Sequence, residues 1–151
     1  MVIETGAFEQ CQSLISVQFL GNIKKLGDHS FQECSRLQHI SAIDTEVISD
    51  NAFYNCVRLT GELKFSSKLK IIGKYSFAFC CNLIGNLVIP ETVTQIGEGA
   101  FQECSGLDGN LTFPENVERI NNYIFFRCIK LNGNLVISEI TEYIGDYSFF
   151  W

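Results

Sequence analysis

Four apolar columns recur along this chain in a fixed order, with a period of 22 to 24 residues. The clearest column is phenylalanine, which occurs at Phe8, Phe31, Phe53, Phe77, Phe101, Phe125 and Phe149. Isoleucine or leucine precedes each of them by five residues, and the first six are followed by cysteine at three residues and leucine at six. These phased columns define a single tandem array of about six and a half units over residues 1–151. One such unit cannot bury its own apolar side, so the units must stack on one another.

Each unit is expected to make one coil of a solenoid. In "GNLVIP", Leu87 and Ile89 alternate with outward positions, which predicts a short strand with one buried face. Val93 and Ile96 mark a second extended piece, and "GEGAFQEC" predicts a tight turn or one turn of 3₁₀ helix. The predicted fold is a right-handed, mainly β solenoid with a parallel strand ladder and with short turns on its convex side. The strands are expected at residues 17–19, 40–42, 63–65, 87–89, 111–113 and 135–137.

Units three to six differ from the first two by one extra residue before the strand. A glycine accompanies the extra residue in each of them, at Gly61, Gly85, Gly109 and Gly133. Glycine adopts backbone conformations that other residues avoid. We therefore expect a bulge or a wider turn at these four positions.

Composition and charge disfavour several classes of protein. Hydrophobic residues make up 46% of the chain, which favours an ordered fold over a disordered one. No apolar run approaches the roughly 18 residues of a membrane helix, and "MVIETGAFEQ" lacks the features of a signal peptide. The net charge of −6 lies in residues 76–151 and argues against wholesale nucleic-acid binding. The local cluster Lys64, Lys68, Lys70 and Lys74 is interpreted as a solvated face.

The repeated phrase resembles a known family. "IPETVTQIGEGAFQECSGLDGNLTFP" is similar to the BspA-type leucine-rich repeats, with their I-G-x-x-A-F-x-x-C-x-x-L core, and the likeness covers essentially the whole chain. The resemblance implies a curved leucine-rich repeat solenoid that is used for binding. Family members are often surface or secreted proteins of bacteria and protozoa that attach to host or extracellular proteins. The resemblance brings no catalytic residues and no cofactor, so we expect that the chain is not an enzyme.

The seven cysteines could bind a metal, form disulfides or have a purely structural role. Six of the seven occupy one repeat position, so they should form a column of parallel inward thiols. Zinc needs four converging ligands, and parallel side chains also disfavour disulfides, so we expect reduced thiols that act as small apolar fillers. Cys81 lies outside the column and is expected to be the one thiol open to oxidation. His29 and His39 have no repeated partner with which to form a catalytic or metal site.

The outward strand positions are the candidate binding site. They should stack into columns on the concave face, which solenoids use for extended binding surfaces. The chosen residues are Gln18, Lys64, Val88, Thr112, Val136, Asn86, Asn110 and Asn134. Val88, Thr112 and Val136 would form an apolar stripe with polar edges, which suits a protein partner. The alternative is that β-branched residues simply favour strands and that the asparagines serve turns.

These observations support a non-catalytic protein-binding module, acting in cell-surface adhesion or in recognition of host or extracellular proteins. An intracellular scaffold with the same fold is the alternative, and a carbohydrate-active parallel β-helix enzyme is a third hypothesis that the outward columns do not favour. Neither end of the array has a polar capping unit, and the last residues are "SFFW". Open solenoid ends expose apolar residues and strand edges. We therefore expect a fragment of a longer array, or end-to-end self-association.

Overall fold

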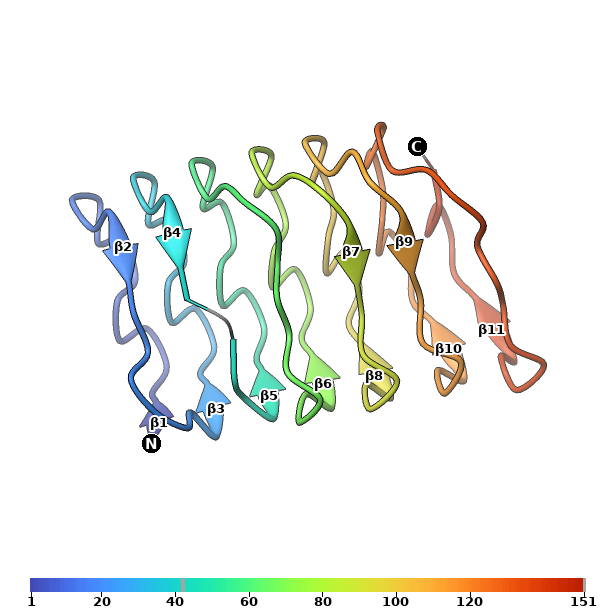
Figure 1. Cartoon of the computed structure of the whole chain (residues 1–151), viewed down its shortest axis with the longest axis horizontal. Helices are drawn as coiled ribbons and strands as arrows, with labels where there is room; N and C mark the ends of the chain where they lie inside the picture. Colours follow the sequence, from blue (N-terminus) through green and yellow to red (C-terminus); the bar gives the residue numbers. More distant parts are fainter. Residues whose placement is uncertain (42, 151) are drawn as a thin grey trace.

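The computed structural model describes residues 1–41 and 43–150 and shows a row of coils stacked side by side (Figure 1). Eleven two-residue strands lie in these residues: β1 (Val2–Ile3), β2 (Ser16–Val17), β3 (Lys25–Leu26), β4 (His39–Ile40), β5 (Val47–Ile48), β6 (Ile71–Ile72), β7 (Leu87–Val88), β8 (Gln95–Ile96), β9 (Leu111–Thr112), β10 (Arg119–Ile120) and β11 (Tyr143–Ile144). Within the same residues there is no helix of the length and apolarity needed to cross a membrane.

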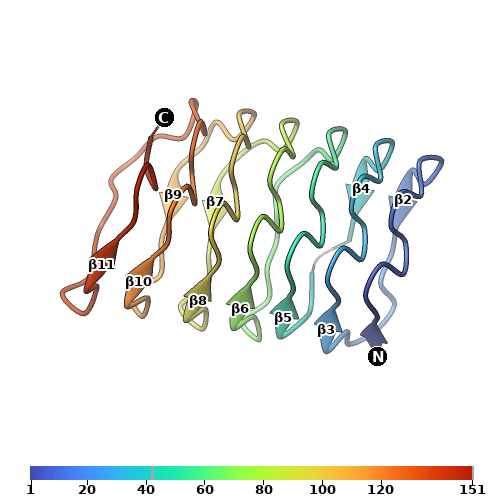
Figure 2. The ribbon, with the colours of Figure 1, turned by 180° about the vertical axis from the view of Figure 1, so that it is seen from behind.

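The strands pair in parallel with the neighbouring coil, which makes the chain a β-solenoid. The longest ladder follows the lower edge in Figure 1 in the order β1-β3-β5-β6-β8, and β10 pairs with β11 further along that edge. The pairs β2-β4 and β7-β9 lie on the near side, which we call the strand face. The chain rises on the far side and descends on the strand face as it advances, which gives a right-handed coil (Figures 1 and 2).

The far side consists of turn segments joined by hydrogen bonds, and we call it the turn face (Figure 2). At the first junction, the N–H groups of Gly6, Phe8 and Gln10 donate to carbonyls of the next coil at 2.7 to 2.8 Å. The N–H groups at the same three repeat positions donate in this way at every later junction. Most of these segments place two residues at positive φ, as at Tyr75 (51°) and Phe79 (62°). The turn face is thus a parallel hydrogen-bonded ladder, although its described residues form no regular strand.

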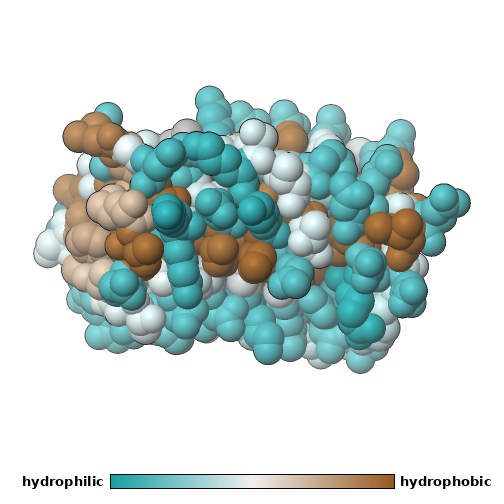
Figure 3. Space-filling view, turned by 90° about the horizontal axis from the view of Figure 1, so that it is seen from below, coloured by the Kyte–Doolittle hydropathy of each residue, from teal (hydrophilic) through white to brown (hydrophobic). Residues whose placement is uncertain are grey.

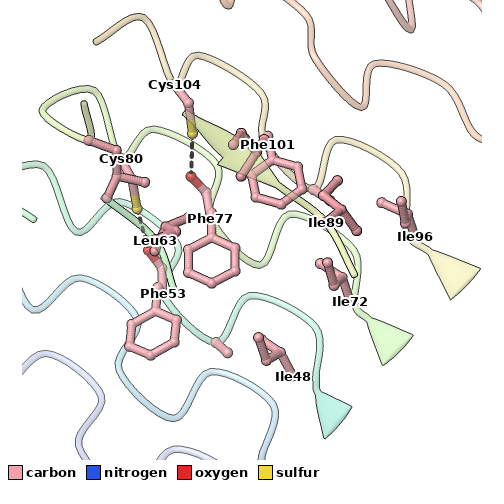
Figure 4. Packing of buried hydrophobic residues seen from close by; sticks show 14 of the residues in the cluster. Ile48, Phe53, Leu63, Ile72, Phe77, Cys80, Ile89, Ile96, Phe101 and Cys104 are labelled. Atoms are coloured by element: carbon pink, nitrogen blue, oxygen red, sulfur yellow. Dashed lines mark hydrogen bonds between the residues drawn. The ribbon is translucent and has the colours of Figure 1, made fainter. Parts of the chain in front are cut away.

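The inward columns form one continuous core. The phenylalanine rings stack on one another with centroids 4.9 to 5.6 Å apart, from Phe8 to Phe149. Aromatic rings from the strand face meet this stack edge-on, such as Phe65 against Phe77 at 5.8 Å. Isoleucines of the lower ladder, including Ile72, complete the buried layer (Figure 4). Because each ring from Phe31 to Phe125 stacks on the rings of both neighbouring coils, the stack helps to fix the register of the array.

The predicted strands are found in register but are shorter than expected. Segments 17–19, 40–42, 87–89 and 111–113 coincide with β2, β4, β7 and β9, although Ala42 lies outside the described residues. Segment 63–65 contributes only the bridge from Phe65 to Ile43. The strand expected at 135–137 is absent because Asn110 bridges Asn132 instead, and this leaves the segment outside the ladder. The longest ladder belongs to the second extended piece, which carries the isoleucine column.

The four inserted glycines have different roles. Gly61, Gly85 and Gly133 have φ values of 92°, 83° and 97°, the left-handed region that glycine favours, and this confirms the expected wide turn. Gly109 lies close to the preceding coil, where a Cβ atom would come within 2.7 Å of the Asn86 backbone nitrogen. Glycine is therefore required there by close approach of two backbones.

Candidate binding surfaces

The strand face carries the eight residues chosen from the sequence, and all eight are exposed. Val88 and Thr112 lie side by side as partners in the β7-β9 pair, and the Val88 side chain is 50% exposed. Val136 is 62% exposed but lies in the segment that is not paired with β9. The apolar stripe is therefore continuous across one coil junction, from Val88 to Thr112.

The asparagines beside this stripe have a partly structural role. The N–H of Asn110 donates to Asn86 Oδ1 at 2.9 Å, so the Asn86 amide holds the neighbouring coil in place. Asn134 does not continue this pairing because Asn110 is bridged to Asn132. One part of the alternative explanation, that these asparagines serve the turns, therefore holds for Asn86.

Gln18 and Lys64 lie apart from the valine stripe, toward the N-terminal end of the strand face. Gln18 follows β2, in the first coil. Lys64 lines a shallow cavity of about 420 Å³ together with His39 and Glu62. This part of the strand face is polar and carries both signs of charge. The strand face thus divides into a polar half and a more apolar half.

Two of the four lysines of the cluster form ion pairs with neighbouring carboxylates. Lys68 Nζ lies 3.0 Å from Asp44 Oδ2, and Lys70 Nζ lies 3.4 Å from Glu46 Oε2. The hydrogen bond from Lys68 lowers the pKa of Asp44 below its ordinary value. Seen from below, this edge of the molecule is mostly hydrophilic, with an apolar area at its N-terminal end (Figure 3). The pairing at Lys68 and Lys70 reduces the positive charge that a polyanion would meet there.

The column cysteines have a role that the sequence did not reveal. All seven cysteines are free thiols, and five of them donate a hydrogen bond to the phenylalanine carbonyl of the preceding coil at 3.0 to 3.2 Å: Cys34, Cys56, Cys80, Cys104 and Cys128. Figure 4 shows this contact for Cys80 with Phe53 and for Cys104 with Phe77. The thiol is thus a specific donor between coils as well as an apolar filler.

Burial raises the pKa of these thiols. The pKa of Cys34 rises to about 11 and that of Cys128 to about 12, with loss of solvation as the largest cause. The pKa values of Cys56, Cys80 and Cys104 are also raised, mainly by burial. Protonated thiols suit a donor role and not metal ligation, which requires the thiolate. No group of three or more metal-ligating side chains occurs in residues 1–41 and 43–150.

The expectation that Cys81 alone would be accessible is not met. Cys81 is half-buried, and its Sγ lies 3.8 Å from the Val57 carbonyl oxygen. Cys11, in the first coil, is also half-buried. Two thiols, in the first and fourth coils, are therefore partly open to solvent.

The turn face carries aromatic residues that the sequence analysis did not single out. The Tyr75 hydroxyl donates to Glu98 Oε1 at 2.8 Å, and burial together with this bond raises the pKa of Tyr75 to about 12. The Phe79 ring meets the Tyr54 ring edge-on at 5.5 Å. Further along, Tyr123 stacks on Tyr147 at 5.7 Å. The sequence gives only a weak signal for them, because tyrosine recurs at one of these outward turn positions, at Tyr75, Tyr123 and Tyr147.

Comparison with protein families and solved structures agrees with this geometry. A family model described as BspA type leucine rich repeat region matches residues 1–108 and 79–151, with six copies of the repeat. A crystal structure of a Treponema pallidum (T. pallidum) leucine-rich repeat protein is 30% identical and superimposes with a TM-score of 0.82. A leucine-rich repeat protein from Bacteroides ovatus is 25% identical with a TM-score of 0.70. A leucine-rich cell surface protein from Faecalibacterium prausnitzii, at 21% identity and a TM-score of 0.55, shares the fold.

These matches cover nearly all of this chain but only part of each solved protein. They cover 96%, 97% and 95% of this chain but only 66%, 43% and 54% of the three proteins, in the same order. The chain therefore spans between about two fifths and two thirds of the length of the solved proteins that it matches. Comparison with functionally curated proteins found no significant match.

Proposed function

Since this chain belongs to the BspA-type leucine-rich repeat family, we propose that it is a protein-binding module that attaches to a host or extracellular protein through its strand face. The family indicates a protein-interaction module, and stacked repeats offer an extended surface for such a role. We further propose that the strand face is the concave side and that the module is non-catalytic. We also infer that the protein to which it belongs is displayed at the cell surface or secreted.

The observation that carries this proposal is the exposed stripe of Val88 and Thr112. An exposed apolar group with polar neighbours is typical of the centre of a protein interface. Here the amides of Asn86 and Asn110 flank the stripe and provide hydrogen-bonding groups at its edge. Val136 is a further exposed apolar residue, in the segment after this stripe that is not paired with β9. The polar half around Lys64 would set the orientation of the partner rather than supply most of the affinity.

The test is a charge introduced into the stripe, compared with the same charge elsewhere. Val88→Asp should weaken binding to purified extracellular-matrix proteins by about tenfold or more, because a carboxylate would be desolvated in the interface. Ile129→Asp is the matched control, since Ile129 is 65% exposed in the turn after Cys128, outside the strand face. Binding is measured by surface plasmon resonance.

Two outcomes would contradict the proposal in different ways. Equal losses for Val88→Asp and Ile129→Asp would show that the strand face is not the interface. Binding that depends on Val88 but occurs only with intracellular proteins would support the scaffold alternative. Labelling of intact cells with a membrane-impermeant reagent then decides whether the protein is displayed outside.

A further inference from the structure

The turn face contains a trough that no part of the protein-binding proposal uses. It has a volume of about 480 Å³ and crosses four successive coils. Its aromatic walls are Tyr54, Tyr75 and Phe79, and its remaining lining is His29, Gln32, Asn51 and Gln102. The volume falls in the range of about 300 to 1,000 Å³ that is typical of sites for small ligands. The trough is therefore of a size for a small molecule or a short segment of a chain.

The tyrosine at the centre of the trough is held in one orientation. The Tyr75 hydroxyl is bonded to Glu98 Oε1 at 2.8 Å, and the ring lies across Gly99 of the next coil. A Cβ atom at position 99 would come within 2.3 Å of the Tyr75 Cε1 atom, so glycine at this position is what leaves space for the ring. On the other side, Phe79 is fixed by its edge-on contact with Tyr54. The aromatic walls are preformed before any ligand arrives.

Both central aromatic residues occupy backbone positions that suit other residues better. Tyr75 and Phe79 have φ values of 51° and 62°, where bulky side chains are rarely found. The preceding coil has Asn51 and Asn55 at the same two repeat positions, and asparagine tolerates this conformation well. Both aromatic side chains are only half-buried, so the core does not require them. Because both rings lie at the surface and line the trough, they are available to a ligand there.

The chemistry of the lining selects the kind of ligand. The lining includes no lysine, arginine, aspartate or glutamate, so it offers a charged ligand no strong ion pair. The amides of Gln32, Asn51 and Gln102 both donate and accept hydrogen bonds, as sugar hydroxyls do. The faces of aromatic rings carry negative charge density that attracts weakly positive C–H groups. Pyranose rings combine an apolar C–H face with a hydroxyl edge, and this matches the two kinds of lining.

We propose that the turn-face trough binds a neutral oligosaccharide, with a sugar ring against Tyr75 and Phe79 and its hydroxyls bonded to the amide side chains. His29 contributes to the polar edge, where its Nδ1 lies 2.5 Å from Gln32 Oε1 and orients that amide. The site is independent of the strand face, so it stands or falls separately from the protein-binding proposal.

The repeat itself provides the variant that tests this site. The double substitution Tyr75→Asn with Phe79→Asn installs the residues that the preceding coil carries at the same positions. It should weaken binding at least tenfold without lowering the melting temperature, because asparagine relieves backbone strain. Tyr147→Asn is the matched control: the same substitution at the same repeat position, three coils away from Tyr75 and outside the trough. It should leave binding unchanged.

The probes are neutral trisaccharides of glucose, N-acetylglucosamine, mannose and galactose, with sialylated and sulfated trisaccharides as charged comparisons. Binding is followed by ligand-observed NMR at up to about 10 mM sugar, which detects a Kd on the order of 1 mM. The expected result is binding of at least one neutral sugar in preference to the charged ones, lost in the double variant only.

Three results would overturn the proposal. The first is that none of the neutral trisaccharides binds to the unaltered chain. The second is that the double variant binds as well as the unaltered chain, or that Tyr147→Asn loses binding equally. The third is a fall in melting temperature in the double variant, which would give Tyr75 and Phe79 a structural role. If a protein partner, and no sugar, is lost in the double variant, the trough is a protein-docking surface instead.

Discussion

The column of buried thiols predicts a steep loss of stability at alkaline pH. Five cysteines are fully buried, and the S–H group of each donates a hydrogen bond to a carbonyl of the preceding coil. Ionisation of a thiol in the folded chain would place a thiolate in apolar surroundings and remove the donor. In the unfolded chain the same thiol ionises near its ordinary pKa of 9.0. Because the pKa is raised on folding, the stability is present below pH 9 and is lost as the pH rises.

The magnitude follows from the number of thiols. A pKa difference of one unit corresponds to about 1.4 kcal/mol for each group, and at pH 10 each raised thiol has lost roughly that amount. Five thiols acting together lower the free energy of unfolding by about 7 kcal/mol between pH 7 and pH 10. The total stability of a small domain is only about 5 to 15 kcal/mol. We therefore expect the array to unfold between pH 9 and the raised values of about 11 to 12.

The assay is urea unfolding followed by circular dichroism at pH 7 and pH 10, with a reductant present. Cys104→Ser replaces the thiol by a hydroxyl that still donates to Phe77 but does not ionise in this range. It should reduce the alkaline loss by about one fifth, or about 1 kcal/mol. Cys104→Ala should reduce the loss equally, and at pH 7 it should cost about 1 kcal/mol because the Phe77 carbonyl loses its donor. A change of less than about 2 kcal/mol in the unaltered chain between pH 7 and pH 10 would refute the reasoning.

Two further predictions concern the inward turn position and the ends of the array. Ser76 Oγ is buried without a hydrogen-bond partner, whereas Ala52 and Ala100 occupy the same repeat position in the neighbouring coils. In urea melts, Ser76→Ala should therefore stabilise the chain by about 1 kcal/mol. Ala100→Ser should destabilise it by a similar amount. Unchanged midpoints in both variants would mean that the hydroxyl finds a partner. The end coils expose Val2 (45%), Ile144 (54%) and Phe150 (56%), so the 151-residue chain should self-associate in sedimentation velocity at tens of micromolar. A single monomeric species there would contradict this.

The residues that face the core could be predicted from the sequence because the repeat period is strict. Phe101, Cys104 and Leu107 recur in phase with their counterparts, and a column that is apolar in every unit has to face the core of a stacked array. Alternation in the strand then placed Val88 and Thr112 outward, where the structure has them. Whether those outward residues contact a partner is a separate question that periodicity does not address.

The backbone conformation of the turn face could not be predicted in the same way. Its conformation depends on positive φ at positions that hold His29, Glu33, Tyr75 and Arg127, among others, and these residues share no propensity for it. The conformation is imposed by the hydrogen bonds between coils, such as that from Phe79 N–H to the Gln102 carbonyl at 2.8 Å. The thiol donors were missed for a related reason, since a column of cysteines looks the same in sequence whether or not the Sγ atoms meet carbonyls.

The two outward faces therefore differ in what a residue choice implies. On the strand face a valine such as Val88 is favourable for the strand itself, so its presence does not require a partner. On the turn face an aromatic residue at positive φ is unfavourable for the backbone, while the neighbouring coil shows that asparagine fits. The backbone conformation alone would favour asparagine at Tyr75 and Phe79. The proposed ligand in the trough that these two rings line gives a functional reason for aromatic residues there.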